Sequence, residues 1–247
     1  MSALPSIARQ KELLSNYESI AKVVSETAKK YVQHKVNLVA VSKLKPSSDI
    51  MGLYNEGVRH FGENYVQELV TKSQELPKDI KWHFIGTLQT DKCKILAKQI
   101  SNLYAVETID SLKKCKKLNS LRKEIDGDVI NVYLQINTSD EPQKSGYSIV
   151  ESERSLIYES VEFLLSEECS HLNFQGLMTI GSIGESFKDE NEDFTRLVNL
   201  KNELNEKYSL DLQTSMGMSN DFEDAIKKGS SSVRVGSSIF GSRPPKN

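Results

Sequence analysis

Short apolar segments alternate with helical patterns along almost the whole chain, and this alternation limits the possible folds more than any other feature. The first segment, Val36–Val41, is rich in β-branched residues, which is typical of a buried parallel strand. Similar segments follow it at regular intervals: Val58–Phe61, Trp82–Ile85, Leu103–Val106, Val129–Ile136, Phe174–Thr179, Leu212–Met216 and Ser232–Val235.

Helical segments between consecutive strands imply parallel pairing, and eight parallel strands close into a barrel whose interior is filled by side chains. The sequence therefore predicts an α/β fold, a single (β/α)₈ TIM barrel over residues 1–247. A doubly wound open sheet is the structural alternative. An extra helix is expected before the first strand, where one apolar stripe recurs at helical spacing: Leu13, Tyr17, Ile20, Val24 and Tyr31.

The connections between these elements contain helix-start signals and polar loops. Asn64, with Gln67 three residues later, resembles a capping pair at the start of a helix. The polar loops Ser139–Tyr147 and Glu185–Asp193 are predicted to be solvated surface rather than parts of a ligand site.

Composition excludes several classes of partner. The chain has 32 basic and 34 acidic residues, and its formal charge of −2 argues against nucleic-acid or anionic-membrane binding. No apolar run approaches the roughly 20 residues that span a bilayer. Cys93, Cys115 and Cys169 are far apart and form no CxxC motif, so we expect reduced thiols in a cytoplasmic protein, with a mitochondrial fraction left open.

Motifs of other common chemistries are missing from the sequence. The chain has no GxGxxG after the first strand and no GxxxxGK[ST], so dinucleotide and Walker-type sites are not predicted. No metal site is predicted either, because there is no HExxH motif and the histidines are scattered: His34, His60, His83 and His171.

Polar and small residues follow the predicted strands, at the end of a barrel where chemistry takes place. Lys43 comes directly after the first strand. A single lysine at such a point is more often a solvated loop residue than a reactive one, so its position alone does not decide its role.

The loops after the last two strands resemble phosphate-binding turns. Glycine lets backbone N–H groups approach a phosphate, serine adds hydroxyl donors, and a following helix start favours an anion. Two glycine turns with a helix cap would explain the same residues equally well. The candidate phosphate contacts are Ser219, Gly236 and Ser237.

Arg234 lies inside the eighth predicted strand, two residues before Gly236, and strand alternation points both residues to the same side. A buried arginine is unfavourable unless it is paired. Arg234 therefore forms a structural ion pair, for example with Glu107, or meets a ligand. A lysine, a phosphate turn and an inward arginine on one rim suit pyridoxal 5′-phosphate (PLP).

Several motifs, in the same order along the chain, resemble those of one family, the YggS/PROSC-type pyridoxal phosphate homeostasis proteins. This family is similar to the barrel domain of bacterial alanine racemase. Asp91 departs from the pattern, since the family usually has asparagine there, although either residue can begin a helix. The matching motifs run from the first strand nearly to the end of the chain: Val41–Pro46, Phe61–Asn64, Trp82–Gly86, Gly176–Gly181, Ser215–Ser219 and Val233–Gly236.

The resemblance implies a cofactor site without assigning a catalytic residue. It implies that Lys43 holds PLP as a Schiff base and that Arg234 faces the pyridine nitrogen. The remaining cofactor contacts that it implies are Asn64 near the ring and Ser219, Gly236 and Ser237 around the phosphate.

The expected function is intracellular PLP homeostasis with little or no catalysis. Arginine stays protonated and cannot pass a proton to the ring nitrogen, which makes the ring a poorer electron sink. Alanine racemase also has a second domain with a tyrosine base, and we expect no such domain here. His83 is expected to be a core histidine rather than a substitute base. The alternatives are an amino-acid racemase or another fold-type III PLP enzyme, and a phosphate-binding barrel enzyme without PLP.

The resemblance also suggests the molecular partners. We expect small amino acids beside PLP, a monomeric state, and transient transfer of PLP to enzymes that use it. Delivery, storage and detoxification of the cofactor all remain open as physiological roles.

Overall fold

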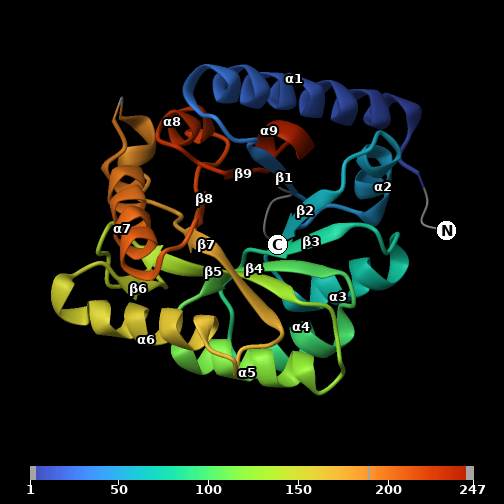
Figure 1. The fold of residues 1–247 in the computed structure, drawn as a ribbon. Helices are drawn as coiled ribbons and strands as arrows, with labels where there is room; N and C mark the ends of the chain where they lie inside the picture. Colours follow the sequence, from blue (N-terminus) through green and yellow to red (C-terminus); the bar gives the residue numbers. More distant parts are fainter. Residues whose placement is uncertain (1–3, 189, 243–247) are drawn as a thin grey trace.

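The computed structural model describes residues 4–188 and 190–242, and these form the predicted α/β barrel (Figure 1). The parallel strands lie in the order β4-β3-β2-β1-β9-β8-β7-β5, and β4 pairs with β5 to close the sheet. A short strand, β6 (Tyr147–Ser148), pairs with the end of β5. The barrel strands are β1 Asn37–Val41, β2 His60–Glu63, β3 Lys81–Phe84, β4 Leu103–Ile109, β5 Ile130–Asn137, β7 Leu172–Met178, β8 Gln213–Ser215 and β9 Ser232–Val235.

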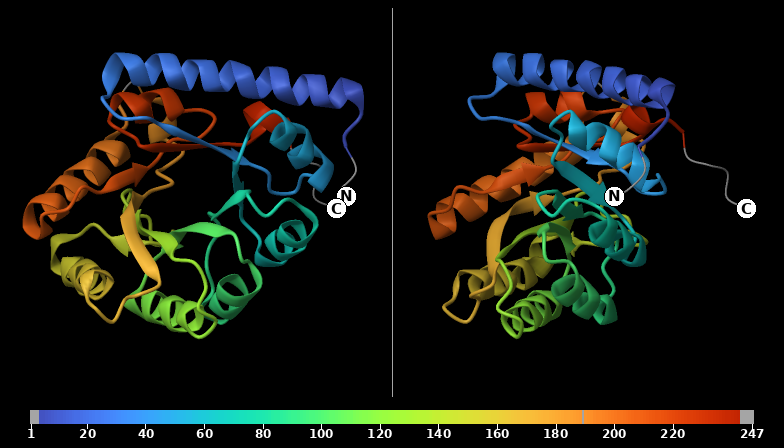
Figure 2. Two further views of the ribbon diagram at one scale, coloured as in Figure 1. Left: turned by 45° about the vertical axis from the view of Figure 1, so that its right-hand side comes forward. Right: turned by 90° about the vertical axis from the view of Figure 1, so that its right-hand side faces the viewer.

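Helices surround the closed sheet on its outside (Figures 1 and 2). Three short 3₁₀ turns add to them, η1 Thr90–Lys92, η2 Glu151–Glu153 and η3 Glu185–Phe187. In the part of the chain that the structure describes, no helix is both long enough and apolar enough to cross a membrane. The helices are α1 Ile7–Tyr31, α2 Ser47–Asn55, α3 Val66–Glu75, α4 Cys93–Gln99, α5 Leu112–Lys123, α6 Arg154–Leu165, α7 Glu192–Tyr208, α8 Phe222–Lys227 and α9 Ser237–Phe240.

The extra N-terminal helix is present as predicted, and it lies across α2, α8 and α9 on the outside of the barrel (Figure 2). Leu13 and Val24 on its apolar stripe are buried. Arg9 ties it to the barrel, because its guanidinium donates to Asp49 Oδ2 at 2.7 Å and to the carbonyl of Phe240 at 2.8 Å. Tyr31 was expected on the same stripe but is 46% exposed, because it is the last residue of the helix and lies at its end.

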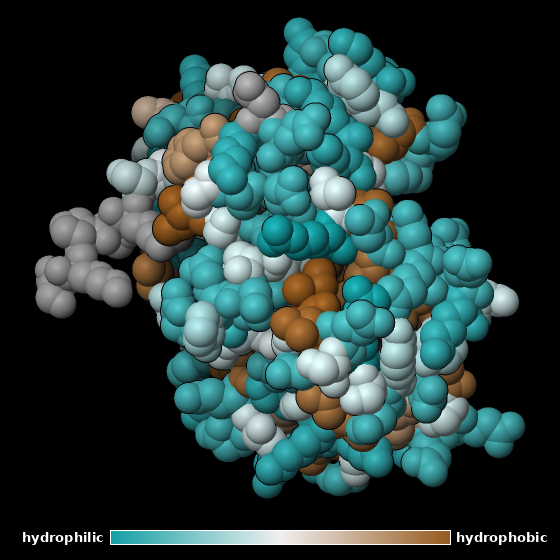
Figure 3. Space-filling view, turned by 90° about the vertical axis from the view of Figure 1, so that its left-hand side faces the viewer, coloured by the Kyte–Doolittle hydropathy of each residue, from teal (hydrophilic) through white to brown (hydrophobic). Residues whose placement is uncertain are grey.

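The main apolar core lies between the strands and the helices, whereas the barrel interior contains buried polar residues such as His83, Glu107 and Arg234. On β3, Trp82 and Phe84 belong to the main core, and His83 between them points to the other side. A small separate apolar cluster contains Ala105, Tyr133 and Met178. The face shown in Figure 3 is mostly hydrophilic, with a small apolar group near its middle.

Several predicted boundaries were wrong. β2 begins two residues later than predicted, and β4 continues beyond Val106 to Ile109. The strand β6 lies at the end of a segment predicted to be a loop. Asn64 does not cap α3, which begins after Tyr65 without a side-chain cap. Asp91 caps no helix either, because it lies inside η1, and its side chain pairs with Lys92.

The packing of α1 leads to the first prediction. We expect Leu13→Ala to lower the free energy of unfolding by about 2–5 kcal/mol, because it leaves a cavity at a fully buried position of α1. Urea denaturation followed by circular dichroism measures this change. Lys11→Ala, at an exposed position of the same helix, should stay within about 0.5 kcal/mol of the wild type. Equal unfolding midpoints for the two variants would contradict the assigned packing.

Candidate functional site

A pocket of about 360 Å³ opens where the barrel strands end, and it is lined by residues from both ends of the chain. Its walls are apolar where Val41, Ile85 and Met178 face it. The polar residues lie around this apolar centre. All the residues predicted to contact the cofactor line this one pocket: Lys43, Asn64, Ser219, Arg234, Gly236 and Ser237.

Lys43 reaches the pocket from the turn that follows β1, and it is half-buried. The next residue, Leu44, has a φ of 61°, a left-handed conformation that non-glycine residues rarely adopt. Lys45 also lines the pocket, but its ammonium donates to the carbonyl of Ser242 at 2.7 Å.

The glycine turns lie at one end of the pocket. Gly217 has a φ of 97°, and a Cβ there would lie 2.5 Å from Cβ of Ala225, so both conformation and space require glycine. Gly236 precedes the four-residue helix α9, whose first N–H groups have no carbonyl of the same helix to bind. The hydroxyls of Ser219 and Ser237 are 3.2 Å apart. This end therefore offers hydroxyl and backbone donors suited to a phosphate.

The backbone of Asn64 packs closely against Gly86, just beyond the end of β3, because glycine has no side chain in the way. A Cβ on Gly86 would lie 1.9 Å from the carbonyl oxygen of Asn64. The side-chain oxygen of Asn64 is buried, and no hydrogen-bond donor reaches it from residues 4–188 or 190–242. A buried acceptor in a pocket wall without a donor fits the hydroxyl or N–H group of a ligand.

Arg234 forms the base of the pocket and is almost completely buried. Its Nη1 donates to Ser215 Oγ at 2.6 Å, and its Nη2 donates to the carbonyl of Thr179 at 2.8 Å. The carboxylate of Glu107 lies 4.0 Å from Nη1. Burial lowers the pKa of Arg234 and the charge of Glu107 raises it, and a guanidinium stays protonated in either case. The predicted ion pair and the predicted pocket position are therefore both present.

Glu107 connects Arg234 to two histidines inside the barrel. Its Oε2 accepts a hydrogen bond from Ser215 at 2.5 Å, and its Oε1 lies 2.6 Å from Nδ1 of His83. His83 is buried as expected, and its Nε2 lies 2.8 Å from Nδ1 of His60. Burial opposes the ionisation of Glu107, but the hydrogen bond and charge of His83 and the charge of Arg234 outweigh it and lower the pKa. Burial also lowers the pKa of His60 to about 3, so that its ring is neutral.

Part of the loop Glu185–Asp193 contributes to the site, so the prediction that this loop is only solvated surface was wrong. Ser186 and Phe187 line the pocket, and Ser186 Oγ donates to Asp221 Oδ2 at 2.6 Å. This contact crosses between loops that are distant in sequence, which is why no local pattern indicated it.

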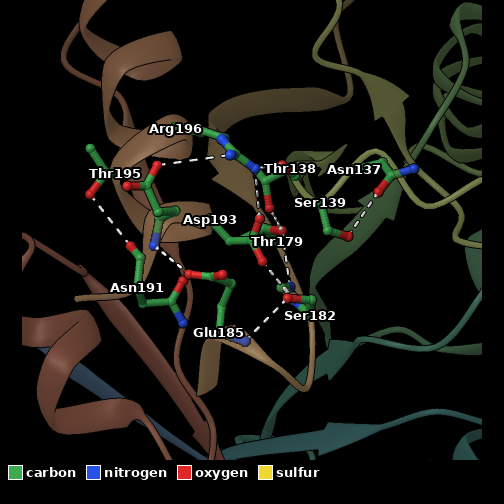
Figure 4. Close-up of polar contacts among 12 residues, drawn as sticks. Asn137, Thr138, Ser139, Thr179, Ser182, Glu185, Asn191, Asp193, Thr195 and Arg196 are labelled. Carbon is green, nitrogen blue, oxygen red and sulfur yellow. Dashed lines mark hydrogen bonds and ion pairs between the residues drawn. The ribbon is translucent and has the colours of Figure 1, made fainter. Parts of the chain in front are cut away.

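A network of polar contacts fixes the segment around that loop (Figure 4). Asp193 accepts a hydrogen bond from the backbone of Ser182 at 2.8 Å and lies 3.6 Å from Arg196. Arg196 in turn donates to the carbonyl of Thr138 at 2.9 Å, and the hydroxyls of Thr138 and Thr179 are 2.9 Å apart. The loops after β5 and β7 are thus held together beside the pocket. Within the described ranges, no three His, Cys, Asp or Glu residues are grouped to hold a metal ion.

Comparison with known proteins identifies the family to which the chain is similar. The family model "Alanine racemase, N-terminal domain" matches residues 15–244. The pyridoxal phosphate homeostasis protein of Schizosaccharomyces pombe is 49% identical over 210 residues, which cover 85% of each chain. The human protein of the same name is 43% identical over 217 residues, which cover 83% of this chain and 76% of its own.

Solved structures agree with the predicted barrel. PipY of Synechococcus elongatus, solved with PLP bound, is similar with a TM-score of 0.72 and 28% identity, covering 90% of this chain and 100% of its own. An alanine racemase of Clostridium difficile has a TM-score of 0.70 and 14% identity, which shows a shared fold only. The match covers 95% of this chain and 58% of the racemase. The resemblance predicted from the motifs and the TIM-barrel fold are both confirmed.

The interior ion pair leads to the second prediction. We expect Glu107→Gln to lower the free energy of unfolding at pH 7 by about 3–5 kcal/mol, because the buried Arg234 loses its counter-charge. Folding lowers the pKa of Glu107 below 4.5, its value in the unfolded chain. The carboxylate therefore stabilises the fold fully above pH 4.5, and this stabilisation is lost as the pH falls through the lower pKa of the folded protein. The difference from the wild type should therefore shrink in strong acid, as urea denaturation at several pH values can measure.

A matched control uses an exposed ion pair. Glu124 pairs with Lys98 and is 52% exposed, so Glu124→Gln should change stability by no more than about 1 kcal/mol. If the two glutamine variants were equally stable at pH 7, the role assigned to the interior pair would be wrong.

Proposed function

This chain belongs to the family of pyridoxal phosphate homeostasis proteins, and we propose that it binds PLP in the pocket lined by Lys43 and takes part in cellular PLP homeostasis, with little or no catalysis. One observation carries the proposal: an amine, a buried guanidinium and a hydroxyl-rich glycine turn surround the same pocket. These groups match the aldehyde, the pyridine nitrogen and the phosphate of PLP. The PLP-bound structure of PipY supports PLP as the ligand.

Each group of the pocket has a distinct part in holding the cofactor. The amine of Lys43 would hold PLP as a Schiff base, and the guanidinium of Arg234 would donate to the ring nitrogen. The side-chain oxygen of Asn64, which no donor of the described residues reaches, would accept a hydrogen bond from the ring substituents. When bound, PLP supplies an aldehyde that condenses with amines and a ring that withdraws electrons. The phosphate would be bound at Ser219, Gly236 and Ser237.

The residues behind the pocket favour binding of PLP over catalysis with PLP. Glu107 stabilises the charge on Arg234, which can donate a hydrogen bond but does not protonate the ring nitrogen. Racemisation also needs acid and base groups on both faces of the substrate. His83 is an unsuitable base for this purpose, since it is 2% exposed and faces Glu107 behind Arg234.

We also propose that small amino acids reach the pocket and that PLP is passed to enzymes that use it. The exposed side chains of Ile183 and Phe187 at the pocket support access to a partner surface. A monomeric, cytoplasmic protein is part of the proposal. Light scattering, cell fractionation and PLP transfer to a PLP-free enzyme would test these points.

The covalent attachment gives the third prediction. After incubation with PLP and reduction with borohydride, mass spectrometry should find one pyridoxyl group, located on Lys43. We expect Lys43→Ala to lose both this adduct and the visible absorbance of the unreduced protein. Lys45→Ala should keep both, because the Lys45 ammonium is bound to the carbonyl of Ser242.

Two results would contradict the proposal. An adduct located on another lysine, or a yellow Lys43→Ala protein, would show that Lys43 does not hold the cofactor. Sustained racemisation of amino acids by the purified protein would favour the racemase alternative instead.

A further inference from the structure

A buried cluster of charged residues lies directly beneath the turn that carries Lys43. Lys72 of α3 donates to Glu63 Oε1 at 2.7 Å, to Glu68 Oε1 at 2.6 Å and to the carbonyl of Ser42 at 2.8 Å. The three hydrogens of its ammonium are thereby all used. We refer to Glu63, Lys72 and Glu68 as the charged triad.

The charged triad contacts the residues on both sides of Lys43. Before Lys43, Ser42 donates its hydroxyl to Glu63 Oε1 at 2.6 Å, in addition to the bond that its carbonyl accepts from Lys72. After Lys43, the backbone N–H of Leu44 donates to Glu68 Oε1 at 2.7 Å. The backbone on either side of the pocket lysine is therefore fixed by one connected set of charges.

Burying these charges is energetically unfavourable, and stability alone does not explain it. Lys72 is 4% exposed and Glu63 is fully buried, and buried ion pairs of this kind are often no more stabilising than apolar residues of similar size. The second carboxylate oxygen of Glu63 has no hydrogen-bond partner among the described residues. Leu44 is held in a left-handed conformation that costs about 1–2 kcal/mol. Strain and unsatisfied polar groups next to a site suggest that they serve that site.

We propose that the charged triad is a positioning device for Lys43, which holds the strained Ser42–Leu44 turn so that the lysine amine is directed into the pocket. The inference rests on the proposed function, because it concerns the attachment of PLP to Lys43. None of the three residues lines the pocket, so they act through the backbone of the turn.

The charge of the triad changes near neutral pH. Burial, together with the charge of Glu68, raises the pKa of Glu63 to about 7, and the ammonium of Lys72 opposes the rise. The charged groups that face Glu63 are Lys72 and Glu68 of α3, and Ser42 of the turn after β1 adds a hydroxyl. As the pH rises past this value, Glu63 becomes a carboxylate and binds Lys72 and Ser42 more strongly. The turn should then be held more firmly.

The fourth prediction separates positioning from a merely structural role. We expect Glu68→Ala, which removes the acceptor for Leu44, to slow the growth of the visible PLP band by about 10- to 100-fold. The affinity for pyridoxine 5′-phosphate, which has no aldehyde, should remain unchanged, because the pocket itself is intact. Glu68→Gln keeps an acceptor oxygen and should restore much of the rate. Glu75→Ala on the same helix, where Glu75 accepts a hydrogen bond from Ser47 at 2.7 Å, should react like the wild type.

A pH series provides a second measurement on the full chain. The rate of borohydride-trapped adduct formation by the wild type should contain a step near the pKa of about 7 of Glu63, in addition to that of the lysine amine. Glu63→Gln should lose this step, because its side chain does not ionise. This variant also tests the proposal should Glu68→Ala fail to fold.

The outcomes separate the proposed function from the positioning role of the charged triad. A wild-type protein that forms no adduct on Lys43 would overturn the proposed function itself. If the wild type forms the adduct and Glu68→Ala forms it equally fast, the positioning role alone is overturned. An equal loss of adduct formation and of pyridoxine phosphate binding would also overturn it, because the triad would then only keep the pocket folded.

Discussion

The ion pair between Glu107 and Arg234 is the contact on which the interior of this barrel depends. The two residues come from β4 and β9, which are not neighbours in the sheet, so their contact crosses the barrel. Ser215 of β8 bridges them by donating to Glu107 and accepting from Arg234. Neither charge would be tolerated there alone, because a buried ion without a partner is strongly unfavourable. The polar interior is therefore stable only as a complete network.

Local sequence patterns predicted the barrel and marked Lys43, Arg234 and the glycine turns as candidates, because each of these signals is contained in a short segment. The family resemblance joined them into one PLP site and added Asn64, since the pocket itself is lined by residues from both ends of the chain. Each strand has its own apolar pattern, and Lys43 and Gly236 lie directly at strand ends. Asn64 was misread as a helix cap because its position depends on the missing side chain of Gly86, which lies just beyond the end of the next strand. Ser186 was assigned to solvated surface because its contact with Asp221 joins two loops that are remote in sequence.

The residues beneath the Lys43 turn were missed for a related reason. Lys72 follows the pattern of an ordinary exposed lysine on an amphipathic helix, and Glu68, four residues earlier, looks like its surface partner. Burial of the pair follows only from the way α3 packs against the turn after β1, where the carbonyl of Ser42 meets Lys72. A buried charge of this kind leaves no signal in a single sequence, since the same letters occur on any solvated helix face.

Both ends of the proposed cofactor site are thus fixed by charges that lie outside it. At the proposed ring end, Ser215 and the carbonyl of Thr179 hold the guanidinium of Arg234 in place and Glu107 balances its charge. A guanidinium there would offer the ring nitrogen no proton that makes the ring a strong electron sink. At the aldehyde end, the turn around Lys43 is held by Glu63, Glu68 and Lys72. In the proposed complex, the first contact would serve binding of the ring and the second would serve access of the amine. Under the proposed function, the protein would hold a reactive aldehyde without using it, because Arg234 would bind the ring nitrogen without protonating it.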